Sequence, residues 1–344
     1  MTPGARSGVS LRDVAAASGV SRTTASLIMN GKTDGFSPTT VDRVRRVAAD
    51  LHYRPNAVAR SLRRQRTHTV GVVSDEIATT PFAGATIRGA QEAAWKAGHV
   101  LVVIDTEGDL EFERAALGAL LERQVDGILY ARMKHLLIEV PAELAEVPTV
   151  LLNARASTPE YAGVAPDEEG GARTAVGRLL AAGHRRIGYL QSGDPVPAAR
   201  ERLEGYRQTL LEAGIAYDPA LVVVDPLEGV SPEPALRLLA MPQPPTAIFC
   251  FNDRIAFGAY NAAHRLGWSI PDDLSVIGFD NDETVALRLD PSLTTIELPH
   301  YEMGRWAMEH LEQLIQGEDV EPVKHRLACP LVERGSLGPP RGSP

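Results

Sequence analysis

The stretch Ser10–Asn30, SLRDVAAASGVSRTTASLIMN, predicts two short helices separated by a turn. Ser10 and Ser21 are of the type that commonly caps a helix N-terminus, and Gly19 allows a tight turn between the helices. We expect burial of the residues at one-face helical spacing, which are Leu11, Val14, Ala15 and Ser18, then Thr24, Ala25, Ile28 and Met29. Such a pair of helices occurs in many helical bundles, and it is also the pattern of a DNA-binding helix-turn-helix.

The outer side of the second helix carries Arg22, Thr23 and Ser26 near its beginning, where a helix-turn-helix places the side chains that enter the DNA groove. The charge distribution favours a polyanionic partner for this part of the chain. Residues 1–66 contain 12 Lys and Arg against 4 Asp and Glu, a net charge of +8. Residues 67–344 contain 23 against 40, a net charge of −17, so the whole chain carries −9. A basic segment on an acidic body indicates a nucleic-acid-binding module joined to an independent domain.

The composition is that of a globular protein with two or three domains, since 344 residues are 44% apolar and 23% charged. No apolar run approaches the roughly 20 residues of a membrane span. The first ten residues lack the apolar segment of a signal peptide, so we expect a cytoplasmic protein without membrane contact. Cys250 and Cys329 lie in separate apolar runs, which favours buried free thiols over a disulfide or a metal site.

Beyond the first two helices, Ser37 and Pro38 begin a third predicted helix. A short helix capped by Asn56 and a basic tether up to residue 68 follow it. From Thr69, apolar strand-like runs alternate with helical segments over nearly 260 residues. This alternation predicts parallel sheets covered by helices on both faces, and its length favours two α/β lobes over one. Residues 335–344 are rich in Gly, Pro and Ser, and we expect them to be disordered.

Four motifs in the right order resemble the LacI/GalR family of bacterial transcription regulators. The first comprises SLRDVAAASGVS from Ser10 and YRPNAVARSL from Tyr53. The second is AAGHRRIGYL followed by RERLEGYRQTL. The third is FNDRIAFGAYNAAHRLGWSIPDDLSVIGFDN, and the fourth is PSLTTIELP. Each motif alone would be weak evidence, but four ordered and correctly spaced matches between about Ser10 and Glu333 are specific.

The resemblance implies an N-terminal all-α helix-turn-helix domain and an α/β, two-lobed effector domain similar to a type I periplasmic binding protein. The expected divisions are a head (1–55), a hinge helix and linker (56–68), an effector-binding and dimerisation domain (69–334) and the tail. Three crossing strands would make the lobes discontinuous, with lobe 1 at about 69–165 and 295–327 and lobe 2 at about 166–294 and 328–334. Family members are usually homodimers, which suits a palindromic double-stranded operator DNA. The chain lacks the C-terminal leucine heptads of tetrameric relatives, which favours a dimer.

For DNA, Arg22 and Thr23 are expected to face base edges, with Ser26 as a third contact. Arginine forms two hydrogen bonds with guanine, although Arg22 could instead touch only phosphate. The family often has arginine where this chain has Leu27, which cannot donate a hydrogen bond. The resemblance implies contacts with the DNA backbone for Ser10, Ser21, Asn30 and Tyr53. It also implies a hinge helix in the minor groove, formed by Asn56, Val58, Ala59 and Leu62. There Leu62 would wedge between base pairs, or it could merely pack the head against the body.

For the effector, Arg202, Asn252 and Asp280 match polar positions of the family's cleft. Together a guanidinium, an amide and a carboxylate can donate to and accept from vicinal hydroxyl groups, which suits a sugar. Asn153 matches a fourth position more loosely, and Thr79 and Phe82 could line the wall of lobe 1. Residues 226–230 lack the aromatic platform of several sugar-responsive relatives.

The chain contains no HExxH, GxSxG, Walker or GxGxxG motif, so we expect neither catalysis nor a cofactor nor a metal. The sequence predicts a ligand-responsive regulator, and specifically a repressor of sugar-utilisation genes that a sugar releases from DNA. Alternative effectors are a purine or a partner protein. A free-standing sugar-binding protein and a sugar-processing enzyme are the alternatives from other classes, and the basic head and the missing catalytic motifs argue against them.

Overall fold

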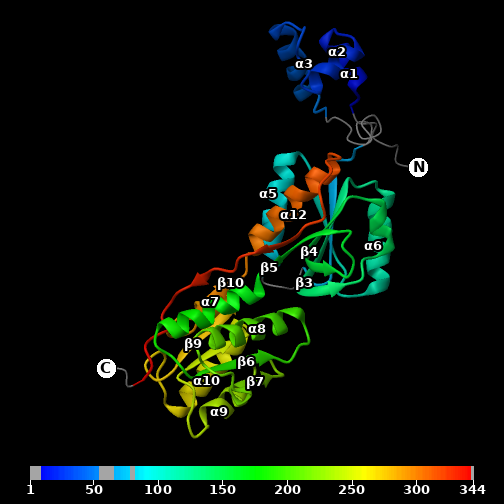
Figure 1. The fold of residues 1–344 in the computed structure, drawn as a ribbon. Coiled ribbons are helices and arrows are strands. Elements are labelled where there is room, and N and C mark those ends of the chain that lie inside the picture. The colour runs from blue at the N-terminus through cyan, green and yellow to red at the C-terminus, as the bar shows by residue number, and fades with distance from the viewer. Residues whose placement is uncertain (1–8, 54–65, 78–81, 342–344) are drawn as a thin grey trace, which may run out of the picture. The chain divides into compact units, whose positions relative to one another are not determined.

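The computed structural model describes residues 9–53, 66–77 and 82–341 (Figure 1). The chain divides into two compact units, Met1–Thr67 and His68–Pro344. The fold confirms the predicted class, a helical head followed by two α/β lobes. Five residues with predicted roles lie outside the described residues: Asn56, Val58, Ala59, Leu62 and Thr79.

The first unit contains α1 (Leu11–Ser18), α2 (Arg22–Met29) and α3 (Pro38–Asp50). The backbone N–H and the hydroxyl of Ser10 both donate to the carboxylate of Asp13, and Gly19 ends α1 with φ 67°. The hydroxyl of Ser21 accepts from the N–H of Thr24. The small core contains Val14, Ala15, Ala25, Ile28, Val41, Val44 and Ala48. Among the residues predicted to be buried, Leu11, Thr24 and Met29 are only half-buried.

Lobe 1 is built on a six-stranded parallel sheet with the strand order β11-β5-β4-β3-β1-β2. Its strands are β1 (Thr69–Ser74), β2 (Val100–Asp105), β3 (Gly127–Ile138), β4 (Thr149–Ala156), β5 (Ala162–Pro166) and β11 (Lys324–Leu327). Helices α5 (Ala83–Ala97) and α12 (His300–Ile315) cover one face, and α6 (Leu110–Glu122) covers the other (Figure 1). A 3-10 helix, η1 (Ala142–Glu146), precedes β4.

Lobe 2 is built on a second six-stranded sheet with the order β12-β10-β9-β8-β6-β7, parallel except for β12. Its strands are β6 (Ile187–Ser192), β7 (Val222–Asp225), β8 (Ala247–Cys250), β9 (Ser275–Asp280), β10 (Thr294–Glu297) and β12 (Leu331–Val332). Its helices are α7 (Glu168–Ala181), α8 (Pro197–Glu212), η2 (Pro219–Leu221), α9 (Glu233–Leu239), α10 (Asp253–Leu266) and α11 (Glu283–Ala286). Cys250 and Cys329 are buried free thiols, as predicted.

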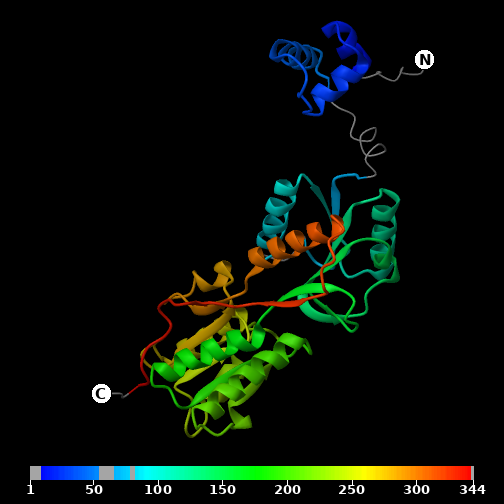
Figure 2. The same ribbon diagram turned by 45° about the horizontal axis from the view of Figure 1, so that its top comes forward.

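The chain passes between the two sheets three times: between β5 and α7, between β10 and α12, and between β11 and β12. Because all of β10 pairs with β9, the second crossing follows Glu297 rather than beginning near residue 295. In Figure 2 the C-terminal segment, drawn in red, runs from lobe 1 to lobe 2. No helix among the described residues is long and apolar enough to cross a membrane.

The C-terminal tail packs on lobe 2 as far as Arg341. The prediction of a disordered segment is therefore wrong for residues 335–341. Ser336 is fully buried. Its hydroxyl accepts from the N–H of Thr294 at 2.8 Å and donates to the carbonyl of Val276 at 2.6 Å. The carbonyl of Gly338 lies 2.9 Å from a ring nitrogen of His184. The tail is ordered because it satisfies polar groups of the second sheet, which its composition does not reveal.

Candidate functional site

The exposed beginning of α2 is the candidate DNA-reading surface. Arg22 and Thr23 are exposed, while Ser26 and Leu27 are half-buried. The side-chain amide of Asn30 donates to the carbonyl of Ser26 at 2.7 Å, which closes the C-terminal end of the helix. The arrangement leaves Arg22 and Thr23 as exposed polar side chains in the first turn of α2.

Ser10, Ser21 and Tyr53 have structural partners within the head. The Ser10 and Ser21 side chains are engaged at the beginnings of α1 and α2. Tyr53 packs against the core of the head, and its N–H donates to the carbonyl of Ala48 at 2.8 Å. The fold of the head therefore holds these three residues in place before any contact with a DNA backbone.

The second unit has a cleft of about 560 Å³ that is lined by both lobes. Phe82, Ala85 and Arg88 come from the start of α5, and His300, Tyr301 and Glu302 from the start of α12. Lobe 2 contributes Asp280 at the end of β9, residues 281–284 after it, and Glu297 at the end of β10, and the second crossing contributes Leu298. The lining thus lies at the carboxyl end of β9, where open α/β sheets commonly bind ligands.

Carboxylates dominate the charge of this cleft. Its lining holds five acidic side chains against one guanidinium, that of Arg88; the acids are Asp280, Asp282, Glu283, Glu297 and Glu302. Such a wall accepts hydrogen bonds from hydroxyl or amino groups and repels anions. Burial raises the pKa of Asp280 to about 8, even though Arg202 beside it acts in the opposite direction.

Arg202 and Asp280, both predicted from the sequence, lie in contact. Nη1 of Arg202 lies 3.3 Å from Oδ1 of Asp280, and its Nε donates to Oε2 of Glu168 at 2.7 Å. Nη1 also donates to the carbonyl of Phe251. Arg202 is only 3% exposed, and its guanidinium lies 3.6 Å from the ring centroid of Phe279. In this conformation the guanidinium therefore binds protein groups beneath the cleft and orients Asp280 in its lining.

Phe82 belongs to the cleft lining, whereas Asn252, which follows β8, does not. Oδ1 of Asn252 accepts from the N–H of Ile255 at 2.8 Å, so the side chain caps α10. The ring of Phe82 stacks on that of His300, with centroids 5.0 Å apart and planes at 15°. Burial lowers the pKa of His300 to about 4, so the imidazole is neutral near pH 7. The stacked pair is an uncharged, flat element of the cleft wall.

Asn153 is buried on β4 and does not belong to the cleft lining. Its amide donates to the carbonyl of Met133 at 3.0 Å, and its backbone has φ 55°. Its Oδ1 has no hydrogen-bond partner among the described residues. The structure therefore gives Asn153 an unused acceptor but does not place it beside Asp280.

The sequence reasoning missed His300, Tyr301 and Arg88 as lining residues. A signal was present for the first two, because the motif PSLTTIELP ends at Pro299, directly before the helix that carries them. No sequence feature distinguished Arg88, which lies one helical turn after Ala85 on α5.

Ion pairs join the lobes beside the crossings. Glu201 on α8 lies 2.5 Å from Nη2 of Arg155 on β4 and 2.9 Å from Nη1 of Arg326 on β11. Although burial raises the pKa of Glu201, the two guanidinium groups outweigh it and hold that pKa below its usual value. A second, exposed pair joins Lys134 to Asp194 at 2.5 Å.

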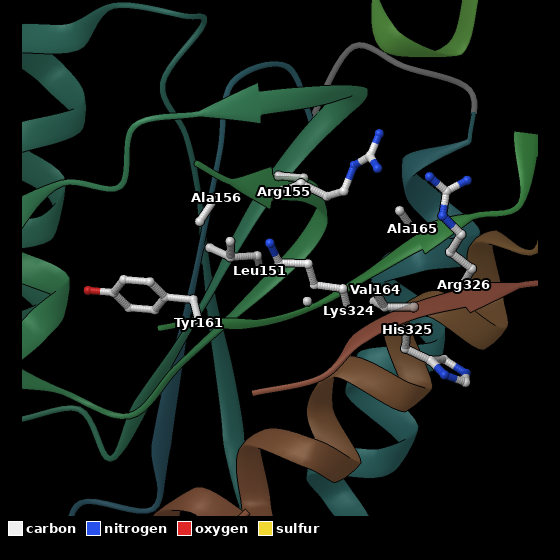
Figure 3. A pocket seen from close by; sticks show the side chains of 11 residues that line it. Leu151, Arg155, Ala156, Tyr161, Val164, Ala165, Lys324, His325 and Arg326 are labelled. Atoms are coloured by element: carbon white, nitrogen blue, oxygen red, sulfur yellow. The ribbon is translucent and has the colours of Figure 1, made fainter. Parts of the chain in front are cut away.

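Arg155 and Arg326 also border a small cavity of about 50 Å³ in lobe 1 (Figure 3). Both guanidinium groups extend to the same side, while His325 points away toward α12, where it stacks on Trp306 with centroids 4.9 Å apart. A cavity of this volume has room for only a few water molecules, so it is too small for a sugar ring.

Two family models match the chain. Residues 10–56 match the model described as bacterial regulatory proteins, lacI family. Residues 176–337 match the model described as a periplasmic binding protein-like domain.

Curated relatives match over nearly the whole length. The HTH-type transcriptional repressor PurR of Photobacterium profundum is 34% identical over 330 residues, covering 95% of this chain and 98% of the relative. The HTH-type transcriptional repressor CytR of Escherichia coli (strain K12) is 34% identical over 332 residues, covering 95% of each chain. These relatives are repressors and not enzymes, in agreement with the missing catalytic motifs.

Solved structures give the same result. A complex of the transcriptional regulator CelR with cellobiose has 32% identity and a TM-score of 0.67, covering 96% of this chain and 100% of that one. The lac repressor dimer bound to operator and the anti-inducer ONPF has 28% identity and a TM-score of 0.79, covering 95% and 98%. The chain therefore belongs to the LacI family of helix-turn-helix transcriptional repressors with a periplasmic-binding-protein-like effector domain.

Proposed function

We propose that this repressor binds a palindromic operator as a homodimer and is released when a neutral, hydroxyl-rich ligand, in the first place a sugar, occupies the cleft. The observation that carries the proposal is the cleft of about 560 Å³ with five acidic side chains in its lining. Its target DNA lies in the bacterial cytoplasm, which is where we propose that it acts.

On the DNA side, Arg22 and Thr23 would read base edges in the major groove. Both are exposed at the first turn of α2, the part of a recognition helix that reaches base edges. Ser26 would contribute through its half-buried hydroxyl, and Ser10, Ser21, Asn30 and Tyr53 would position the head on phosphates. The hinge residues Asn56, Val58, Ala59 and Leu62 would enter the minor groove.

The acidic lining supports a sugar over a sugar phosphate. Carboxylates accept hydrogen bonds from hydroxyl groups, whereas bringing a phosphate beside several of them is strongly unfavourable. The carboxyl group of Asp280, held in position by Arg202, would hydrogen-bond ligand hydroxyls at the lobe 2 wall. Because its pKa is about 8, this group is largely protonated near pH 7 and can donate as well as accept. Asn252 would be a further polar contact. The solved structure of CelR, which is similar over 96% of this chain, is a complex with cellobiose. Phe82 would pack against the apolar face of the sugar ring.

A nucleoside is the second candidate ligand, because of the stacked pair of Phe82 and His300. A flat aromatic base could extend this stack, while the ribose hydroxyls would face the carboxylates. The neutral form of His300 favours stacking on an uncharged base. The two candidates differ in a testable way, since only the nucleoside needs the aromatic surface of Phe82 for most of its contact area.

Two apolar surfaces of the second unit support a homodimer. On lobe 1 the exposed apolar side chains include Trp95, Val100, Val102, Val103, Leu110 and Phe112. On lobe 2 an apolar groove of about 420 Å³ includes Val230, which is 82% exposed, and Phe257. Monomeric proteins rarely expose a large contiguous apolar surface such as the groove on lobe 2. The lac repressor, which resembles this chain, is a dimer on its operator.

Ligand binding would act through the junction between the lobes. A ligand that draws the cleft walls together changes the distances that Glu201 spans to Arg155 and Arg326. Because the effector and the operator would favour different arrangements, each must weaken the other's binding by the same coupling free energy, typically about 1–3 kcal/mol.

The test begins with selection of operator sequences from random DNA by the full-length protein. Release of the selected duplex is then followed by fluorescence anisotropy while neutral sugars, sugar phosphates and nucleosides are titrated. We expect release by a neutral sugar, and we expect Asp280→Asn to retain operator binding but to weaken that response at least tenfold. The matched control is Asp272→Asn, an exposed carboxylate in the loop before β9, which should respond like the wild type. Release by sugar phosphates alone, or an Asp280→Asn response equal to that of Asp272→Asn, would contradict the proposal.

A further inference from the structure

Three potential metal ligands meet at the amino ends of neighbouring strands in lobe 1. His68 directly precedes β1, His99 directly precedes β2, and Asp126 directly precedes β3. The strand register pairs Thr69 with Val100 and Val70 with Gly127, so the three preceding residues come together. The cluster therefore lies at the amino ends of β1, β2 and β3, at the far end of these strands from their carboxyl ends.

The ligand atoms of this cluster lie close together. One ligand atom from each of the three side chains falls within 4.8 Å of the others. Oδ2 of Asp126 accepts from the backbone N–H of His68 at 2.7 Å, and the rings of His68 and His99 have centroids 5.6 Å apart. The side chain of His99 is 2% exposed, and neither ring nitrogen makes a hydrogen bond with the described residues. A buried imidazole without hydrogen bonds needs another source of stabilisation.

The distance between the ligand atoms of His99 and Asp126 fits binding to one metal ion better than a direct hydrogen bond. Nε2 of His99 lies 3.3 Å from Oδ2 of Asp126. A charge-assisted hydrogen bond between such groups would be shorter, about 2.7–2.9 Å. Two ligands bound tetrahedrally to one zinc ion at about 2.0–2.1 Å are separated by about 3.3–3.4 Å. The third ligand, His68, is half-buried, and one of its ring nitrogens lies within 4.8 Å of the other two ligand atoms.

A carboxylate lies behind the buried histidine. Oε2 of Glu312, on α12, is 3.3 Å from Nδ1 of His99, on the side of the ring opposite Asp126. Metal-bound histidines commonly hold their second ring nitrogen against a carboxylate, which orients the ring and strengthens its donor nitrogen. Glu312, His99 and a metal ion bound beside Asp126 would thus follow the carboxylate–histidine–metal order.

We propose that His68, His99 and Asp126 bind a divalent transition-metal ion, with Zn²⁺ as the best match. Two imidazoles and one carboxylate are ligands that suit Zn²⁺, whereas Mg²⁺ and Ca²⁺ prefer oxygen alone. A water molecule would complete the four-coordinate site. Because His68 lies where the chain enters β1 from the segment that follows the head, the ion ties that entry point to the turns before β2 and β3. The site is independent of the effector cleft and of the ligand proposed there.

The experiment uses the full-length chain without an affinity tag, stripped with EDTA and dialysed. Zn²⁺ is titrated in competition with a chromophoric chelator, and Co²⁺ is added separately to record visible absorption. We expect one Zn²⁺ per chain with micromolar or tighter affinity, and Co²⁺ bands of a four-coordinate site. His68→Asn should weaken binding at least tenfold, and it keeps a residue that tolerates the φ of 53° found at this position. Glu312→Gln should weaken it about tenfold, the usual effect of losing such a supporting carboxylate.

His264→Gln, on the exposed side of α10, is the matched control and should bind Zn²⁺ like the wild type. Circular dichroism of each variant establishes that the fold is retained before titration. A wild type that binds no Zn²⁺ near one equivalent would overturn the proposal. Equal Zn²⁺ affinities of His68→Asn and His264→Gln would overturn it as well.

Discussion

Replacing Arg202 with methionine tests whether the buried ion network beneath the cleft is organised as the structure describes. Arg202 bridges Glu168, at 2.7 Å, and Asp280, at 3.3 Å, and lies over the rings of Phe251 and Phe279. Methionine fills much of the same volume and packs well against aromatic rings, so little cavity is created. The change therefore removes charge and hydrogen bonds rather than bulk.

The expected loss in the free energy of unfolding is about 3–5 kcal/mol, the usual effect of removing one partner from a buried ion pair. The reason is that Glu168, whose side chain is 2% exposed, would remain without its cation in a region that excludes water. The matched control is Arg178→Met on α7. Arg178 makes two hydrogen bonds with Glu333, at 2.8 and 2.9 Å, but Glu333 is exposed and Arg178 is only half-buried, so the expected loss is only about 0–1 kcal/mol.

The assay is urea unfolding followed by tryptophan fluorescence. All three tryptophans, Trp95, Trp268 and Trp306, belong to the second unit, so the signal reports on that unit without the head. A loss of less than about 1.5 kcal/mol for Arg202→Met, or a loss equal to that of Arg178→Met, would refute the reasoning. Removing the cation beside a buried carboxylate should lower the free energy of unfolding by more than that.

The effect of Arg202→Met should also depend on pH. Burial already raises the pKa of Asp280 to about 8, whereas an unfolded aspartate titrates near 4. A group whose folded pKa is raised holds its proton more tightly in the folded state, so stability falls as the pH rises between these two values. Without Arg202 the pKa of Asp280 rises further, so this fall continues to higher pH. The loss measured at pH 8 should therefore exceed that at pH 5, and an equal loss would contradict the assignment.

Three further substitutions test other parts of the molecule. Gly304→Ala places a Cβ 2.0 Å from the carbonyl oxygen of Thr86 and should destabilise the second unit by about 1–3 kcal/mol, while Gly118→Ala, with open space around it, should be neutral or slightly stabilising in the same unfolding assay. Arg22→Ala should weaken binding to the selected operator by about 1–3 kcal/mol but change binding to random DNA little; equal losses in an anisotropy titration would assign Arg22 to phosphate. Phe257→Asp should shift the protein toward monomers in sedimentation velocity, and an unchanged dimer would move the interface elsewhere.

The parts that could be predicted from the sequence depend on local physics. Ser10, Ser21 and Ser37 begin helices because a hydroxyl can satisfy backbone N–H groups in the first turn, which is readable within three residues. The alternation of apolar runs predicted the two parallel sheets for the same reason, since each strand and helix carries its own period. Arg202 and Asp280 were found only by their resemblance to family motifs.

The remaining features depend on contacts between distant residues, which periodicity does not encode. Glu168 was not singled out because its role arises only when α7 and α8 pack together and bring it to Arg202. Composition predicted a disordered tail, but Ser336 is held by hydrogen bonds to Thr294 and Val276, which lie 42 and 60 residues earlier in the chain. His300 belongs to the cleft because the chain returns to lobe 1 just before it.

Helices α5 and α12 connect the cleft to the opposite edge of the lobe 1 sheet. Both begin in the cleft lining, and at about 1.5 Å per residue each extends roughly 22–24 Å from it. A Cβ at Gly89 would lie 2.0 Å from the carbonyl oxygen of Tyr301, so the helices are too tightly packed to deform separately. A ligand that displaces the start of α12 must therefore move the pair together. Their far ends include Trp95 on the exposed apolar surface and Glu312 beside His99, so the displacement reaches both the proposed dimer surface and the entry to β1.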